Sequence, residues 1–123
     1  MKNKIKILIV EDESITAKSL KMDLEKFGVD VLDPIAKGEV AVKVAIQENP
    51  SLILMDIRLA GGLDGIEAAE KIILVKNIPI VFMTGYATEE MKERTLNMNP
   101  VDYLEKPIDM YRLGQIIDKL KKK

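Results

Sequence analysis

Several residues with chemically useful side chains follow short apolar runs of the sequence. Glu11 and Asp12 come directly after the first run, Asp56 and Thr84 follow two later runs, and Lys106 comes after the last one. The chain contains no cysteine and no histidine, which excludes thiolate nucleophiles, imidazole bases and the commonest transition-metal ligands. Any chemistry must therefore use carboxylates, hydroxyls, amines and hard cations.

These residue types together predict phosphoryl transfer. Clustered carboxylates repel one another and are best neutralised by a hard divalent cation, for which Mg²⁺ fits and Mn²⁺ could substitute. Lys106 would supply a second positive charge and Thr84 a neutral donor, so the charge of an arriving phosphoryl group would be neutralised. Asp56 would be the oxygen nucleophile, forming an acyl phosphate.

Each acidic residue also has a plain structural explanation. Glu11 and Asp12 could cap a helix or place charge in its first turn. Asp56 is harder to explain in this way, because it ends the apolar run 52–55 where burial is expected. A buried carboxylate needs a cation or hydrogen-bond donors close by.

The elements that must position these side chains alternate between strands and helices. Strands are predicted where the sequence is almost continuously apolar, as in a parallel sheet covered on both faces. These segments are 5–10, 52–55, 78–83 and 101–104. A weaker run, 29–35, suits an edge strand because it contains Asp30, Asp33 and Pro34.

Helical periodicity fills the intervals between the strands. The predicted helices cover 14–27, 39–47, 64–73, 88–96 and 109–120. Gly28 suits the end of the first helix, Asp64 and Glu67 have the spacing of a capping box, and Thr88 suits an N-cap.

Five strand–helix units in succession imply right-handed crossovers. The predicted fold class is therefore α/β, with a five-stranded parallel sheet and helices on both faces. We expect one (βα)5 flavodoxin-like domain over residues 1–123, with strand order 2-1-3-4-5. Ligands of such sheets bind beyond the carboxyl ends of the strands, where the residues singled out above would meet.

Charge and composition exclude several other classes of function. The net charge is −1, from 19 basic and 20 acidic residues, which argues against direct nucleic-acid binding. The basic tail, 119–123, suits the last turn of a helix. The apolar run 7–10 is too short for a signal peptide or a membrane span, so we expect a cytoplasmic protein without membrane contact.

Five motifs in order resemble the receiver domains of two-component response regulators. They are Ile5–Glu13, Leu54–Leu59, Asp64–Glu67, Met83–Tyr86 and Asp102–Pro107. The resemblance implies a phosphorelay switch that takes a phosphoryl group from a sensor histidine kinase or phosphotransfer protein. Such a domain is no turnover enzyme, beyond self-phosphorylation from small donors and slow autodephosphorylation.

The resemblance also implies an output partner that reads the surface of the fourth helix, fifth strand and fifth helix. It implies a monomer, or a dimer that forms on phosphorylation. Separately, Ile15 and Met22 lie away from the apolar stripe of the first helix and could belong to a docking face for the phosphodonor.

The resemblance assigns roles around the metal. Asp56 would be the phosphoacceptor and Asp12 a direct Mg²⁺ ligand. Glu11 would help to hold the ion, often through water, and Arg58 would offer its backbone carbonyl. The loop 59–63 is one residue longer than the usual family version and lacks its proline, and its two glycines permit positive φ.

The resemblance assigns further roles to residues late in the chain. Thr84 and Lys106 would contact the phosphoryl oxygens, and the bond between Lys106 and Pro107 would be cis. Tyr103 would swing inward as Thr84 moves, although an aromatic at a strand end can also simply pack there.

Three other interpretations fit parts of the sequence. A domain of this kind could have lost its function, so that its acidic side chains are merely solvated. A flavin carrier would need a phosphate-binding loop after the first strand, where Glu11 to Glu13 would repel a phosphate. A phosphohydrolase with an Asp nucleophile typically has an acid two residues later, at a position that Arg58 occupies here.

Overall fold

The computed structural model describes residues 4–122, so the two ends of the expected domain, including the last lysine of the basic tail, lie outside the described residues. Five parallel strands form one sheet in the order β2-β1-β3-β4-β5, which confirms the predicted flavodoxin-like topology. The strands are β1 (Lys6–Val10), β2 (Asp30–Val31), β3 (Leu52–Asp56), β4 (Ile80–Thr84) and β5 (Asp102–Glu105).

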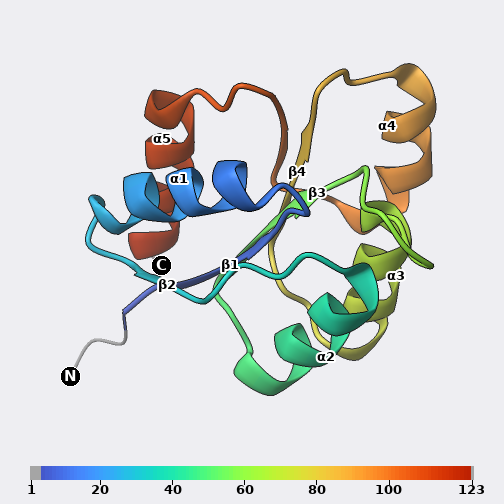
Figure 1. Ribbon diagram of the computed structural model, residues 1–123, viewed down its shortest axis with the longest axis horizontal. Helices are drawn as coiled ribbons and strands as arrows, with labels where there is room; N and C mark the ends of the chain where they lie inside the picture. The colour runs from blue at the N-terminus through green and yellow to red at the C-terminus, as the bar shows by residue number, and fades with distance from the viewer. Residues whose placement is uncertain (1–3, 123) are drawn as a thin grey trace.

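Helices cover both faces of the sheet (Figure 1). They are α1 (Ser14–Glu25), α2 (Gly38–Glu48), α3 (Gly65–Val75), α4 (Glu89–Thr95), the short 3₁₀ helix η1 (Leu96–Met98) and α5 (Met110–Lys121). Helices α1 and α5 lie side by side on one face, and α2, α3 and α4 occupy the other (Figure 1). None of the helices in the part of the chain that the structure describes is both long and apolar enough to cross a membrane.

The alternation of side chains along the strands produces two cores. In β1, Ile7 and Ile9 pack with the α1 and α5 layer, whereas Leu8 and Val10 pack with the α2 and α3 layer. All four side chains have no exposed surface. Full burial of such a side chain is worth about 1.5–3 kcal/mol, so the apolar strands hold both helical layers in place.

Local signals in the sequence are confirmed at several helix ends. Asp64 accepts a hydrogen bond from the Glu67 backbone N–H (2.8 Å) and Glu67 accepts one from the Asp64 N–H (2.9 Å), which completes the capping box. Thr88 caps α4 by accepting from the Met91 N–H at 3.1 Å. Gly28 follows α1 with a φ of 76°, a conformation that favours glycine.

The edge strand is shorter than predicted. Instead of the whole run 29–35, only Asp30–Val31 pairs with β1 as a strand, and Ile35 forms a separate bridge with Val10. Pro34 has no N–H to donate to a ladder, and Asp33 faces outward to pair with Lys21 at 3.0 Å. The ladder is therefore interrupted between these two contacts.

Candidate functional site

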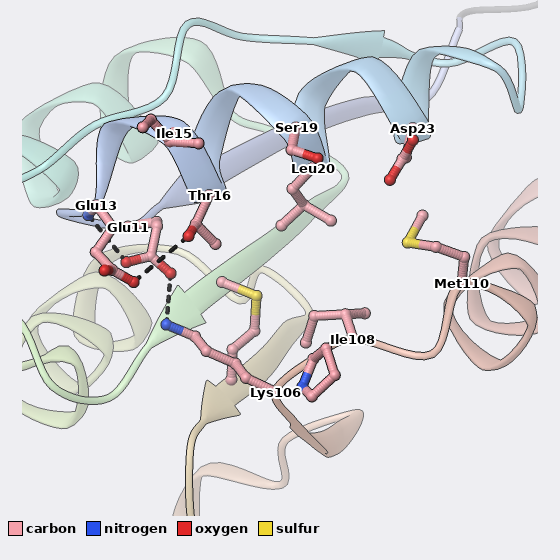
Figure 2. Close-up of a pocket in the computed structure, with 12 residues that line it drawn as sticks. Glu11, Glu13, Ile15, Thr16, Ser19, Leu20, Asp23, Lys106, Ile108 and Met110 are labelled. Atoms are coloured by element: carbon pink, nitrogen blue, oxygen red, sulfur yellow. Dashed lines mark hydrogen bonds and ion pairs between the residues drawn. The ribbon is translucent and has the colours of Figure 1, made fainter.

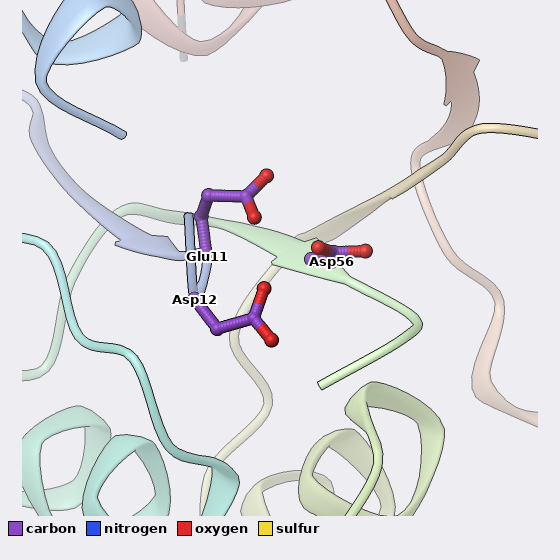
Figure 3. A group of neighbouring side chains, drawn as sticks. All are labelled: Glu11, Asp12 and Asp56. Carbon is purple, nitrogen blue, oxygen red and sulfur yellow. The ribbon is translucent and has the colours of Figure 1, made fainter. Parts of the chain in front are cut away.

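Three carboxylates meet at the carboxyl ends of β1 and β3. In the ladder between these strands Val10 lies opposite Met55, so the residues that follow, Glu11 and Asp56, are neighbours. Oxygen atoms of Glu11, Asp12 and Asp56 lie within 4.8 Å of one another (Figure 3). Glu11 and Asp56 are only 2% and 4% exposed, whereas Asp12 is exposed. The structure thus brings the three predicted acids into one cluster.

Lys106 supplies the positive charge of this cluster. Its Nζ lies 2.5 Å from Oε1 of Glu11 and 3.0 Å from Oδ2 of Asp56. The residue comes directly after β5, and its backbone N–H donates to the Thr84 carbonyl at 2.8 Å. The following bond to Pro107 is cis, the isomer that the resemblance implies. Contact with Asp56 fits the predicted role of Lys106, but its closer contact with Glu11 was not predicted.

Burial and pairing give the three groups different acidities. Burial raises the pKa of Asp56 to about 6, and the negative charge of Glu11 adds to this effect although the Lys106 ammonium opposes it. Burial also acts on Glu11, but hydrogen bonds from Lys106 and the Glu13 N–H outweigh it, so the pKa of Glu11 is lowered. Burial opposes protonation of Lys106, yet its two carboxylate partners raise its pKa. Of these three groups, Asp56 is therefore the one whose pKa lies closest to neutral pH.

Backbone donors of the loop after β3 face the same acids. The Arg58 N–H donates to Oδ1 of Asp56 at 3.1 Å, and the Ala60 N–H donates to Oδ2 of Asp12 at 3.2 Å. The loop returns close to the strand at Gly65, where a Cβ atom would lie 2.0 Å from the Asp56 carbonyl oxygen. Only glycine fits there, so the start of α3 fixes the loop against Asp56.

The donor set of the cluster fits a hard divalent cation. Glu11, Asp12 and Asp56 offer carboxylate oxygens only, and such ligands suit Mg²⁺ rather than softer metals. Lys106 offsets part of the negative charge of Glu11 and Asp56, which leaves a net negative site for the ion.

Two of the residues predicted to switch, Thr84 and Tyr103, form a second group of side chains with Thr95, and we call these three residues the hydroxyl set. Thr84 is fully buried, and its hydroxyl bonds within its own turn, with the N–H and the carbonyl of Tyr86, each at 3.2 Å. The ring of Tyr103 stacks on Phe82 with centroids 6.0 Å apart. Its hydroxyl contacts the hydroxyl of Thr95 in α4.

The side chain of Tyr103 is half-buried and packs inward against the core in this structure. Its swing on movement of Thr84 stays a prediction. Thr95, which has no exposed surface, also bonds to the Met91 carbonyl at 3.0 Å. Sequence reasoning missed Thr95, although Met91 and Thr95 are four residues apart and so share one face of α4.

A groove of about 580 Å³ opens beside the cluster, between α1 and the segment that joins β5 to α5 (Figure 2). Leu20, Met83 and Ile108 are among its apolar lining residues, and Glu11 and Lys106 lie at one end. Ile15 also lines the groove and is 83% exposed, while Met22 is 64% exposed. Both residues are therefore accessible on α1, as predicted.

Comparisons with known proteins agree with this geometry. The family model of the response regulator receiver domain matches residues 7–118. The receiver domain of a modulated diguanylate cyclase from Desulfovibrio desulfuricans G20 is 37% identical, with a TM-score of 0.87, and the alignment covers 96% of this chain and 94% of that one. A receiver domain of the sensor histidine kinase PA1611 from Pseudomonas aeruginosa, solved with a magnesium ion coordinated in its active site cleft, is 30% identical, with a TM-score of 0.83 and coverage of 96% and 98%.

A curated relative extends beyond the matched region. The transcriptional regulatory protein PdtaR of Mycobacterium tuberculosis is 30% identical over 113 residues, which are 92% of this chain but 55% of that protein. The sequence motifs, the strand order and the family match all indicate the same family. The chain belongs to the receiver domains of response regulators, the phosphoryl-accepting signalling domains of two-component systems.

Proposed function

We propose that this domain accepts a phosphoryl group onto Asp56 in a Mg²⁺-dependent reaction and signals through a change of its surface. The observation that carries the proposal is the buried Asp56 carboxylate beside Glu11 and the Lys106 ammonium. A group buried in this way and shifted toward neutral pH marks a site of chemistry rather than a solvated surface. The domain spans residues 1–123 in this proposal.

The geometry around Asp56 suits an oxygen nucleophile. Lys106 holds Oδ2 and the Arg58 N–H holds Oδ1, so the plane of the carboxylate is fixed. One of these oxygens attacks the phosphorus of a phosphohistidine, the P–N bond breaks, and the imidazole leaves with its electron pair. Lys106 then neutralises charge on the transferred group, and Thr84 would reach it from the end of β4.

Glu11, Asp12 and Asp56 would hold the Mg²⁺ ion, together with the Arg58 carbonyl. When bound, the ion supplies charge neutralisation for the phosphoryl oxygens. Mn²⁺ would substitute for it, because carboxylates suit both ions. The magnesium ion of the Pseudomonas receiver domain supports this proposal.

The groove beside the cluster is our candidate for the phosphodonor's docking site. Its apolar lining continues onto exposed Ile15 of α1, and it leads to Glu11 and Lys106 (Figure 2). An amphipathic helix of a histidine kinase or phosphotransfer protein would bury its apolar face there. The output partner would read the face of α4, β5 and α5, with the domain either monomeric or dimeric after phosphorylation. The domain would carry out this function in the cytoplasm.

The other interpretations have less support. Glu11, Asp12 and Glu13 follow β1 where a flavin carrier would bind phosphate, and their charge opposes an anion. Arg58 stands where a phosphohydrolase would have its second acid. Its N–H is already bonded to Asp56, so this position restrains the nucleophile instead.

Intact mass spectrometry with acetyl phosphate tests the proposal. The wild-type protein should gain the mass of one phosphoryl group in Mg²⁺ and not in excess chelator. Asp56→Asn should gain none, because an amide is a poor nucleophile, while its circular dichroism stays that of the folded domain. Undiminished labelling of Asp56→Asn would place the acceptor elsewhere and refute the central role of Asp56.

A further inference from the structure

The loop between β3 and α3 borders the proposed metal site and contains two adjacent glycines. They are Gly61, whose φ is +105°, and Gly62. Adjacent glycines lose more conformational entropy on ordering than other residues do. The same loop includes Arg58, the residue whose carbonyl is proposed to face the ion. Contacts with neighbouring segments must therefore hold the loop in place.

One end of the loop is tied to the acidic cluster. Arg58 and Ala60 donate their backbone N–H groups to Asp56 and Asp12. These contacts position the loop only up to residue 60, before the glycines begin.

The other end of the loop is tied to the first turn of α2. Oε1 of Glu39 accepts a hydrogen bond from the Leu63 N–H at 3.0 Å. The carboxylate also lies beside both glycines, since Cβ atoms built on Gly61 and Gly62 would be 3.8 Å and 3.7 Å from Oε1. Glu39 thus braces the part of the loop that the acidic cluster does not reach.

Close packing allows this contact to form. A Cβ atom on Gly38 would lie 2.9 Å from the Leu63 carbonyl oxygen and 3.0 Å from the Leu63 Cβ. Only glycine lets α2 approach the loop so closely, and Glu39 is the next residue. Gly38 therefore allows the close approach of Leu63, and Glu39 accepts its N–H.

We propose that Glu39 is a positioning residue for the metal site: it acts on the ion through the loop and does not ligate it. This inference rests on the proposed function for the identity of the ion. Loss of the Glu39 contact frees the glycine pair, so the Arg58 carbonyl is held less well. Because one hydrogen bond is lost, Mg²⁺ affinity should fall about three- to tenfold.

Two substitutions at Glu39 separate positioning from simple charge. Glu39→Ala removes both the charge and the hydrogen-bond acceptor, whereas Glu39→Gln removes the charge but keeps a carbonyl oxygen for the Leu63 N–H. Glu90→Ala is the matched control, because Glu90 is another exposed acid in a helix first turn. The wild type and the three variants are titrated with MgCl₂ by amide NMR, and exchange of the Leu63 amide is measured without metal.

The inference expects a weaker Mg²⁺ affinity and faster Leu63 exchange in Glu39→Ala, with Glu39→Gln and Glu90→Ala close to the wild type. Equal losses in Glu39→Ala and Glu39→Gln would show a charge effect and overturn it. An unchanged Glu39→Ala would overturn it as well. Phosphorylation of the wild type is a separate readout: if it fails while Mg²⁺ affinity still depends on the Glu39 acceptor, the proposed function falls and the positioning role stands.

Discussion

Two groups of side chains in and beside the sheet are held by different forces. The first, the charged cluster of Glu11, Asp56 and Lys106, has short ion pairs and shifted pKa values. The second, the hydroxyl set of Thr84, Thr95 and Tyr103, has neutral hydrogen bonds and the stacking of Tyr103 on Phe82. The charged cluster takes its residues from the carboxyl ends of β1, β3 and β5, whereas the hydroxyl set takes them from the end of β4, the end of α4 and the body of β5.

On the proposed function, this difference would separate detection from transmission. Buried charges respond strongly to an added ion or phosphoryl group, because the low dielectric of the site amplifies their interaction. Neutral hydroxyls respond to geometry, since a small displacement breaks their bonds. A signal that begins at Asp56 would therefore have to become a displacement before it reaches Tyr103. The backbone contact between Lys106 and Thr84 is one place where the two groups join.

Removal of the cation of the charged cluster should have the largest effect on stability. Lys106→Met would leave Glu11 and Asp56 as two buried neighbouring carboxylates without a cation. At pH 7 and without metal, the free energy of unfolding should fall by about 2–4 kcal/mol. Urea unfolding followed by circular dichroism measures the loss. Lys71→Met, a change at an exposed lysine of α3, is the control and should change little; a similar small effect at Lys106 would contradict the electrostatic account.

The pH dependence of stability tests the same cluster at a single group. Folding raises the pKa of Asp56 from 3.8 to about 6, so its contribution is fully present below pH 3.8 and is lost as the pH rises through 6. Asp56→Asn does not ionise. Its stability relative to the wild type should therefore increase by about 1–3 kcal/mol between pH 4 and pH 7 in metal-free buffer.

Urea titrations of both proteins at several pH values provide this difference. A constant difference across the range would mean that the carboxyl of Asp56 has an ordinary acidity in the folded protein. Mg²⁺ should shrink the effect in the wild type, because the ion favours the ionised carboxylate.

The smallest effect on stability is expected in the hydroxyl set. Thr95→Val keeps the shape of the side chain but removes the partner of the Tyr103 hydroxyl, so stability should fall by about 1 kcal/mol. Unlike the effects at Asp56, this loss should not change between pH 4 and pH 7. Ring NMR shifts of Tyr103 report whether it leaves Phe82, and Thr95→Ser should restore them. A loss that varies with pH would remove the distinction between the two groups.

The sequence predicted the charged cluster better than the hydroxyl set, for a physical reason. Asp56 and Lys106 follow apolar strands, and the edge at which parallel strands end is fixed by topology. The rotamer of a tyrosine is set by its neighbours in space, so the inward position of Tyr103 depends on Thr95 and Phe82. No local pattern in the sequence predicts the contacts of Tyr103 with Thr95 and Phe82.

The same division holds for the rest of the fold. Strand order and the Asp64 capping box follow from short-range signals and from the alternation of elements. The hydrogen bond that the Leu63 N–H donates to Glu39 joins residues 24 positions apart, and the sequence shows Glu39 only as an acid in a helix first turn. The strand β2 ends early because Pro34 has no N–H for the ladder and Asp33 faces outward to pair with Lys21.

The ion pair between Lys106 and Glu11 has a consequence for synthesis of the protein. It joins residues 95 positions apart in a chain of 123, so it closes most of the chain into one loop and is among the least local contacts of the fold. A nascent chain presents Glu11 and Asp56 long before the ribosome has added Lys106. Until β5 joins the sheet, the two acids would lack the Lys106 ammonium as their partner. On the proposed function, a competent acceptor would exist only once Lys106 has been added and β5 has paired with β4, so a chain that stops short of β5 would not be phosphorylated.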